Sequence, residues 1–262
     1  MEKMNSAKRR MEIFNILQKD QSVKVLDLAE IFGVSLMTIR RDLALFEKQG
    51  LITTNYGGAY LNSKSAIEPS FSLKSSQMTD KKQLIGYNAA KLVEDGDTII
   101  IDCGTTTLQM AKYLQDKKLT VITNSWPVVN YLGSNSKIKL ILAPGEYNDV
   151  SAGAISDLTI NFFTNFHADK VFMGSHGCGI ESGATVPEIM DANVKRSLLH
   201  AAKQKILLAD NTKFGQTYLM KYADLSEFDY LITDNSIDQK CFMQLKDIIR
   251  NVIIADNENN NE

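Results

Sequence analysis

Apolar residues in the first sixty positions recur at the spacing of an amphipathic helix. Met11, Phe14 and Leu17 stand among charged residues between positions 7 and 18. A period near 3.6 residues places such positions on one helical face. The pattern therefore predicts a first helix, which ends at the polar stretch "KDQS".

Two further apolar faces follow, separated by the tripeptide Gly33-Val34-Ser35. The first contains Val25, Leu28, Ala29 and Phe32, and the second contains Ile39, Leu43 and Phe46. Gly33 can adopt the positive φ of a sharp corner, and Ser35 is a favoured N-cap. The pattern predicts a helix-turn-helix, in which the second helix enters the major groove of DNA.

The residues at the start of that second helix are the candidate contacts to DNA. Because Ile39 and Leu43 face inward, Arg40 and Arg41 should project outward, where arginine pairs with guanine edges or with phosphate oxygens. An isolated pair of arginines is usually only solvated, but this pair stands in the helix that directly follows the turn. The candidates are Ser35, Leu36, Met37, Thr38, Arg40 and Arg41.

A short hairpin is predicted after these helices. The segment "LITTNYGGAYL" alternates apolar and polar residues around Gly57-Gly58, and such glycines allow a backbone to lie close to phosphate. Tyr56, Gly57 and Gly58 are therefore further candidate DNA contacts. Residues 1–61 are interpreted as a winged helix-turn-helix domain.

The remaining chain alternates helical and strand patterns. Residues 62–80, rich in Ser and Lys, are interpreted as a linker, residues 81–256 as a second domain and residues 257–262 as a disordered tail. The strand runs are "DTIIID", "LTVITN", "IKLILA", "ADKVFMGS", "QKILLAD" and "FDYLITD". Continuous apolar strands separated by helices predict an α/β domain whose parallel sheet is covered on both faces.

Polar loops follow several of these strands and should converge, because small ligands bind beyond the carboxyl ends of parallel strands. In the loop "DCGTTT", Gly104 permits a tight turn, and Thr105, Thr106 and Thr107 offer hydroxyls and amides to a phosphate. Threonines are also good N-caps, and for this motif taken alone the structural interpretation is the more common one. Asp102, Lys213 and His176 are further candidates in such loops.

Composition and charge narrow the class of protein. The 262 residues suggest two domains, and 44% hydrophobic with 23% charged residues is ordinary for a globular protein. Net charge is -2, but residues 1–61 carry nine basic against seven acidic residues. Three separated cysteines favour free thiols in the cytoplasm, and no apolar run predicts a membrane span or a signal peptide. The scattered His167, His176 and His200 predict no metal site, and no cofactor is expected.

The segment "RRMEIFNILQKDQSVKVLDLAEIFGVSLMTIRRDLALFEKQGLITTNYGGA" resembles the DNA-binding module of the DeoR family of bacterial transcription regulators. The match includes the core "VSLMTIRRDL" and the wing "GGA". The family usually has Arg and His before the wing glycines, where this chain has Thr54 and Tyr56. Fewer charged wing contacts would reduce the salt-dependent part of DNA affinity.

The second domain is similar to the DeoR sensor domain in "KKQLIGYNAAKLVEDGDTIIIDCGTTT", "LTVITNS", "GATVPEIMDANVKRSLL" and "ILLADNTKFG". The resemblance implies a Rossmann-like α/β fold related to sugar-phosphate isomerases, with a pocket for a phosphorylated sugar. The implied pocket residues are Asp102, Gly104, Thr105, Thr106, Thr107, Thr123, Asn124, Gly145, the 174–179 loop beginning at Gly174, Lys195 and Lys213. Asn148 stands where the family commonly has an arginine, so a strong contact to an anion is absent there.

The function expected is that of a repressor of carbohydrate-metabolism genes, which binds double-stranded operator DNA as a homo-oligomer, a dimer or tetramer. A phosphorylated sugar would modulate its operator affinity. One alternative is a constitutive DNA-binding protein whose degenerate sensor serves oligomerisation. Another is an isomerase-like enzyme, which would need a positioned acid or base. Although Asp102, Glu181, Glu188 and Asp210 are present, they lack the acidic motif of those isomerases, so no enzyme is expected.

Overall fold

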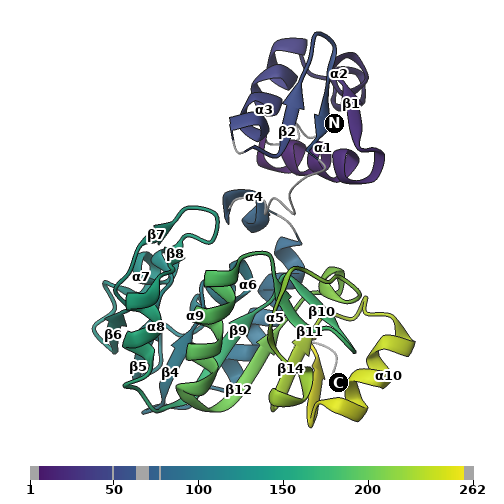
Figure 1. Ribbon diagram of the computed structural model, residues 1–262. Helices are drawn as coiled ribbons and strands as arrows, with labels where there is room; N and C mark the ends of the chain where they lie inside the picture. The colour runs from purple at the N-terminus through teal and green to yellow at the C-terminus, as the bar shows by residue number, and fades with distance from the viewer. Residues whose placement is uncertain (1–5, 49, 63–70, 77, 257–262) are drawn as a thin grey trace. The chain divides into compact units, whose positions relative to one another are not determined.

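The computed structural model describes residues 6–48, 50–62, 71–76 and 78–256 (Figure 1). The chain divides into two compact units, Met1–Gln77 and Met78–Glu262. The linker expected at 62–80 lies partly outside the described residues, and its later part contains α4 (Phe71–Ser76) and the start of α5 (Thr79–Lys91). The tail expected at 257–262 lies wholly outside them. Across the described ranges, no helix is both long and apolar enough to cross a membrane.

The first unit has the three predicted helices and the predicted hairpin. Its elements are α1 (Ser6–Asp20), β1 (Ser22–Lys24), α2 (Val25–Phe32), α3 (Leu36–Lys48), β2 (Ile52–Thr54) and β3 (Gly58–Leu61). The sequence pattern did not predict β1, which pairs antiparallel with β3 and completes a sheet of order β1-β3-β2. A strand of three residues is too short to show an alternating pattern.

The corner between α2 and α3 has the predicted conformation. Gly33 is left-handed, with φ 60° and ψ 38°, and Val34 N donates to Ala29 O at 3.1 Å. The Ser35 hydroxyl accepts a hydrogen bond from Thr38 N at 3.2 Å. The glycine turns the chain and the serine caps α3, so the direction of α3 is set by two adjacent local interactions.

The second unit is built on the predicted parallel sheet. Its strands are β4 (Thr98–Ile101), β5 (Leu119–Thr123), β6 (Ile138–Leu142), β9 (Ala168–Gly174), β12 (Ala202–Leu208), β14 (Tyr230–Thr233) and β15 (Asn251–Ile254). The order is β15-β14-β12-β9-β4-β5-β6, with every neighbouring pair parallel. The pattern predicted six of these strands. It missed β15, an edge strand whose four residues are all half-buried.

Helices cover both faces of this sheet (Figure 1). They are α5, α6 (Thr105–Ala111), α7 (Trp126–Leu132), α8 (Asp157–Phe163), α9 (Ile189–His200) and α10 (Gln239–Ile248). Ile99 and Ile101 pack in the apolar cluster beneath α5, α6 and α7. Ile100 packs in the cluster beneath α8, α9 and α10. The alternation of adjacent side chains between faces explains why the strand is continuously apolar.

Small antiparallel elements stand among the loops that follow the strands. They are β7 (Tyr147–Asn148), β8 (Gly153–Ala154), β10 (Gly177–Gly179), β11 (Gly183–Val186) and β13 (Met220–Ala223). β7 pairs with β8, while β10, β11 and β13 form a three-stranded sheet. The segment at 174–185, expected to be a loop, is therefore largely a hairpin. It gives the sequence between β9 and α9 a fixed shape.

Candidate nucleic-acid interface and effector site

The outward face of α3 carries the residues predicted to contact DNA. Ile39 and Leu43 are buried as predicted, and both Arg40 and Arg41 are exposed. At the start of the helix, Leu36 and Met37 are 40% and 57% exposed. The helix therefore presents apolar and cationic side chains together, which suits both base methyl groups and the acceptors of base edges or phosphates.

Asp42 is a buried residue of α3 that sequence reasoning missed. Its Oδ2 lies 2.7 Å from Arg9 Nε and its Oδ1 lies 3.1 Å from Arg10 Nε. Both arginines belong to α1, so the carboxylate fixes α3 against that helix. The available signal was its spacing, because Asp42 follows the inward-facing Ile39 by three residues and shares its face. A buried charge needs such partners.

The wing differs in part from its prediction. Tyr56 is fully exposed and Gly57 is also exposed, but Gly58 is buried. A Cβ atom at Gly58 would lie 2.1 Å from the carbonyl oxygen of Val23 in β1. A glycine is therefore required at this position by its close packing against β1, and the predicted contact of Gly58 with phosphate stays a prediction.

Thr54, which stands where the related family usually has a basic residue, is joined to α3. Its backbone N and its hydroxyl both donate to Glu47 Oε1, at 3.0 and 2.5 Å. These hydrogen bonds lower the pKa of the Glu47 carboxyl below its ordinary value. These hydrogen bonds join β2 of the wing to the C-terminal end of α3.

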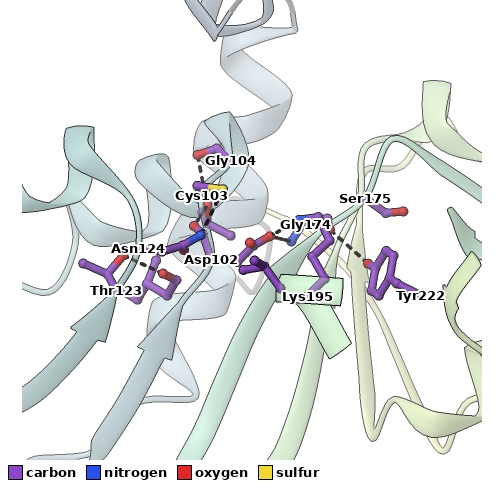
Figure 2. A network of polar contacts seen from close by, with 12 residues as sticks. Asp102, Cys103, Gly104, Thr123, Asn124, Gly174, Ser175, Lys195 and Tyr222 are labelled. Atoms are coloured by element: carbon purple, nitrogen blue, oxygen red, sulfur yellow. Dashed lines mark hydrogen bonds and ion pairs between the residues drawn. The ribbon is translucent and has the colours of Figure 1, made fainter. Parts of the chain in front are cut away.

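In the second unit, Asp102 and Lys195 form a buried ion pair at the carboxyl ends of β4 and β9 (Figure 2). Lys195 Nζ lies 2.5 Å from Asp102 Oδ2, and the same oxygen accepts from Gly174 N at 3.0 Å. Burial alone would lower the pKa of Lys195, but the carboxylates of Asp102 and Asp191 outweigh it and hold the pKa well above its ordinary value. The counter-charge of Asp102 is therefore Lys195, which comes from α9.

Two buried oxygens beside this pair lack hydrogen-bond donors among the described residues. They are Asp102 Oδ1 and Asn124 Oδ1. Asn124 Nδ2 donates to Ala154 O at 3.1 Å and to Cys103 Sγ at 3.4 Å, which fixes the direction of the amide (Figure 2). Both orphaned atoms are acceptors. A ligand hydroxyl, which can donate, is the chemical complement of such atoms.

Some of the candidate threonines are buried and hydrogen-bonded to the backbone, and others remain accessible. The Thr107 hydroxyl is within hydrogen-bonding distance of the carbonyl oxygens of Asp102 and Gly104, at 2.8 and 2.9 Å. The Thr123 hydroxyl donates to Ile101 O at 2.6 Å. Both side chains are fully buried, whereas Thr106 is 8% exposed and Thr105 is half-buried. Thr107 and Thr123 hold the loops in shape, and Thr105 is the most accessible of these hydroxyls.

A cavity of about 490 Å³ adjoins Asn124. Gly145, another predicted residue, also lines it, together with the aromatic side chains of Trp126 and Tyr147, which sequence reasoning missed. Gly145 has φ 149°, and a Cβ there would lie 2.2 Å from Thr159 Oγ1. The glycine is therefore required by packing against α8 as well as by its backbone conformation.

The remaining candidates lie in neighbouring loops. Lys213 ends a short 3-10 turn after β12, and a hydrogen bond from Gly215 N to Cys178 O joins that loop to β10. The ring of His176 lies 6.0 Å from that of Tyr218. Asn148 Oδ1 accepts hydrogen bonds at 3.0 Å from Val150 N, Ser151 N and the Ser151 hydroxyl. The amide oxygen of Asn148 therefore holds its own turn.

Sequence reasoning also missed the contacts that position Lys213 and Lys195. Asp234, which follows β14, accepts from Asn211 N at 2.6 Å and forms an ion pair with Lys81 of α5 at 2.8 Å. Burial raises the pKa of Asp234, but its hydrogen bonds to Lys81, Asn211 and Ser236 bring the net pKa below its ordinary value. The Tyr222 hydroxyl donates to Gly174 O at 2.9 Å (Figure 2). Asp234 and Tyr222 are both buried, and their hydrogen bonds hold the loops that carry these lysines or contact them.

Two protein-family models match this sequence. The DeoR-like helix-turn-helix domain matches residues 9–65, and the DeoR C terminal sensor domain matches residues 77–235. The HTH-type transcriptional repressor GlcR of Bacillus subtilis is 33% identical over 93% of this chain and 94% of its own length. The lactose phosphotransferase system repressor of Staphylococcus epidermidis is 33% identical over 89% of this chain and 94% of its own. The solved ribose 5-phosphate isomerase A of Methanocaldococcus jannaschii is 16% identical, with TM-score 0.38, over 52% of this chain and 54% of its own.

Proposed function

We propose a function for this chain, which belongs to the DeoR family of transcriptional regulators. In this proposal the protein is a repressor that binds operator DNA through α3 and the wing. It acts as a DNA-binding regulator and not as an enzyme. The observation that carries the proposal is the exposed Arg40 and Arg41 on a helix fixed by the Gly33 turn and by Asp42. Repression is supported by the names of the two relatives described above.

Titration of the full chain against the DNA upstream of its own gene cluster tests this proposal. We expect saturable binding that weakens as salt rises, because basic side chains displace counterions from phosphates. Arg40→Ala with Arg41→Ala should abolish specific binding. The matched control replaces two exposed cations of the second unit, Lys139→Ala with Arg250→Ala. Equal DNA binding by the two double variants would refute the proposal.

The proposed effector is a phosphorylated sugar at the carboxyl ends of the parallel strands. Sugar hydroxyls would donate to Asp102 Oδ1 and Asn124 Oδ1, the orphaned buried acceptors beside the Asp102–Lys195 pair. Because Lys195 is already paired with Asp102, the phosphate would need another cation. Lys213 is half-buried at the same edge of the sheet, and it supplies that charge in the proposal.

A thermal-shift screen with phosphorylated sugars and their dephosphorylated forms tests the effector. Ligand at about a hundredfold excess over its Kd should stabilise the native state by about 2.7 kcal/mol. Asn124→Ala should remove most of this effect, and the exposed Asn130→Ala on α7 serves as its control. Stabilisation of Asn124→Ala equal to that of the unaltered chain would contradict the role of its amide oxygen.

Asn148 supports a second candidate function, namely constitutive DNA binding with the second unit used for oligomerisation. Its side-chain oxygen accepts three hydrogen bonds within its own turn, at the position where the related family commonly carries arginine. If no phosphorylated sugar stabilises a chain that binds operator DNA, this second function is favoured over effector control.

A further inference from the structure

The exposed residues of α3 are not equivalent in direction. Successive residues of an α-helix turn by about 100°, so positions i, i+4, i+7 and i+11 share one stripe. The buried face consists of Ile39, Asp42, Leu43 and Phe46. The stripe directly opposite consists of Met37, Arg41, Ala44 and Lys48, all of which are exposed.

Arg40 lies on a different side of the helix from Arg41. It shares a flank with Glu47, seven residues further on. Glu47 hydrogen-bonds Thr54 of β2, so this flank is the one beside the wing. A helix inserted in the major groove puts its outermost stripe nearest the base edges, and its flanks face the sugar-phosphate walls. The two arginines therefore approach different parts of the duplex.

We infer that Arg41 contacts a guanine edge and Met37 a thymine methyl group, while Arg40 contacts a phosphate on the wing side. This inference rests on the proposed DNA-binding function. Met37 is 57% exposed, and an apolar side chain at the tip of the stripe suits a C5-methyl group. Ala44, between Arg41 and Lys48, is small enough to let the helix approach the bases closely.

The spacing of these residues sets the spacing of the bases. Met37 and Arg41 are separated by one helical turn, a rise of about 6 Å. Stacked bases are separated by about 3.4 Å. The guanine and the thymine should therefore lie within about two base pairs of each other in the half-site.

Selection of binding sites from a random DNA library, with the full chain and three single variants, separates the roles. Arg41→Ala should reduce discrimination at one guanine by about tenfold or more. Arg40→Ala should weaken binding to all sequences alike and lower the slope of log K against log salt by about one. Arg250→Ala is the control for loss of one exposed positive charge in the second unit.

Replacement of the selected thymine by deoxyuridine tests Met37, because it removes only the methyl group. The unaltered chain should lose several-fold in affinity, whereas Met37→Ala should bind both DNAs equally. Sequence-specific binding in which Arg40→Ala relaxes base preference, or in which Met37→Ala still prefers thymine, would overturn this inference alone. Absence of any DNA binding by the unaltered chain would overturn it together with the proposed function.

Discussion

Asp102 and Lys195 are 93 positions apart in the chain, yet they share a contact of 2.5 Å from which solvent is excluded. Asp102 was predicted near a ligand from its position in a polar loop, and Lys195 was predicted there only from the family resemblance. Their pairing was not predictable, because it depends on the rotation of α9 above the sheet. Asp42 shows the same limit, since its partners lie on another helix.

Lys195→Met should destabilise the protein by about 3–5 kcal/mol, because it leaves the Asp102 carboxylate buried without its cation. Lys203→Met is the control, since Lys203 forms an exposed pair with Asp169 at 3.2 Å that should contribute less than about 1 kcal/mol. Urea unfolding followed by circular dichroism measures both. Adding Asp102→Asn to Lys195→Met should recover part of the loss, and equal stability of the two single variants would contradict the argument.

The lowered pKa of Asp234 should make the protein less stable as the pH falls into the acid range. Its native pKa is lowered from an ordinary 3.8, so its stabilising effect is fully present above that value and is lost as pH falls through the native pKa. Asp234→Asn should be less stable than the unaltered chain at pH 7. Between about pH 5 and pH 3 the stability of Asp234→Asn should fall less steeply than that of the unaltered chain. Urea midpoints at each pH test this, and parallel pH profiles would count against it.

At the scale of elements, the sequence pattern predicted the helices with several turns, the hairpin around the glycine pair and most of the continuously apolar strands. Three helices and a hairpin in the first unit, and six strands of the main sheet, are confirmed. The strands that it missed, β1, β7, β8, β10, β11, β13 and β15, contain two to four residues each. Most of these short segments are strands because a neighbour pairs with them, and their own composition carries little signal. β15 is the exception, because Val252, Ile253 and Ile254 give it the β-branched composition of the predicted strands.

The pairing of β1 with the wing gives a matched test with glycine. Gly58→Ala should cost about 1–3 kcal/mol, because its Cβ would meet Val23 O at 2.1 Å. Gly57→Ala should change stability by no more than about 0.5 kcal/mol, since nothing lies within 4 Å of a Cβ there. Urea unfolding of the full chain compares them. Equal stability of the two variants would contradict the argument that β1 requires glycine at position 58.

At the scale of the whole molecule, the sequence predicted two domains and where polar loops converge, but not which side chains remain open to a ligand. Thr107 and Thr123 were predicted as ligand contacts, and their hydroxyls hydrogen-bond backbone carbonyls. Those contacts depend on the final positions of loops from different strands. Their predicted contact with an effector stays a prediction.

The proposed coupling between effector and operator must be reciprocal. If a phosphorylated sugar changes operator affinity by some factor, saturating operator must change sugar affinity by the same factor. A coupling of about 5- to 150-fold is typical. Calorimetric titration of the effector into the free chain and into the chain bound to operator measures one factor, and operator titrations without and with effector measure the other. Equal effector affinity of the free and the operator-bound chain would contradict the proposed coupling.

The cavity beside Asn124 has one further consequence. Trp126 lines it and is 49% exposed, and the chain contains a single tryptophan. The tryptophan fluorescence of the unlabelled protein therefore comes from Trp126 alone, at the side of this cavity. A molecule that entered the cavity would displace water from the indole ring of Trp126 and so change its fluorescence.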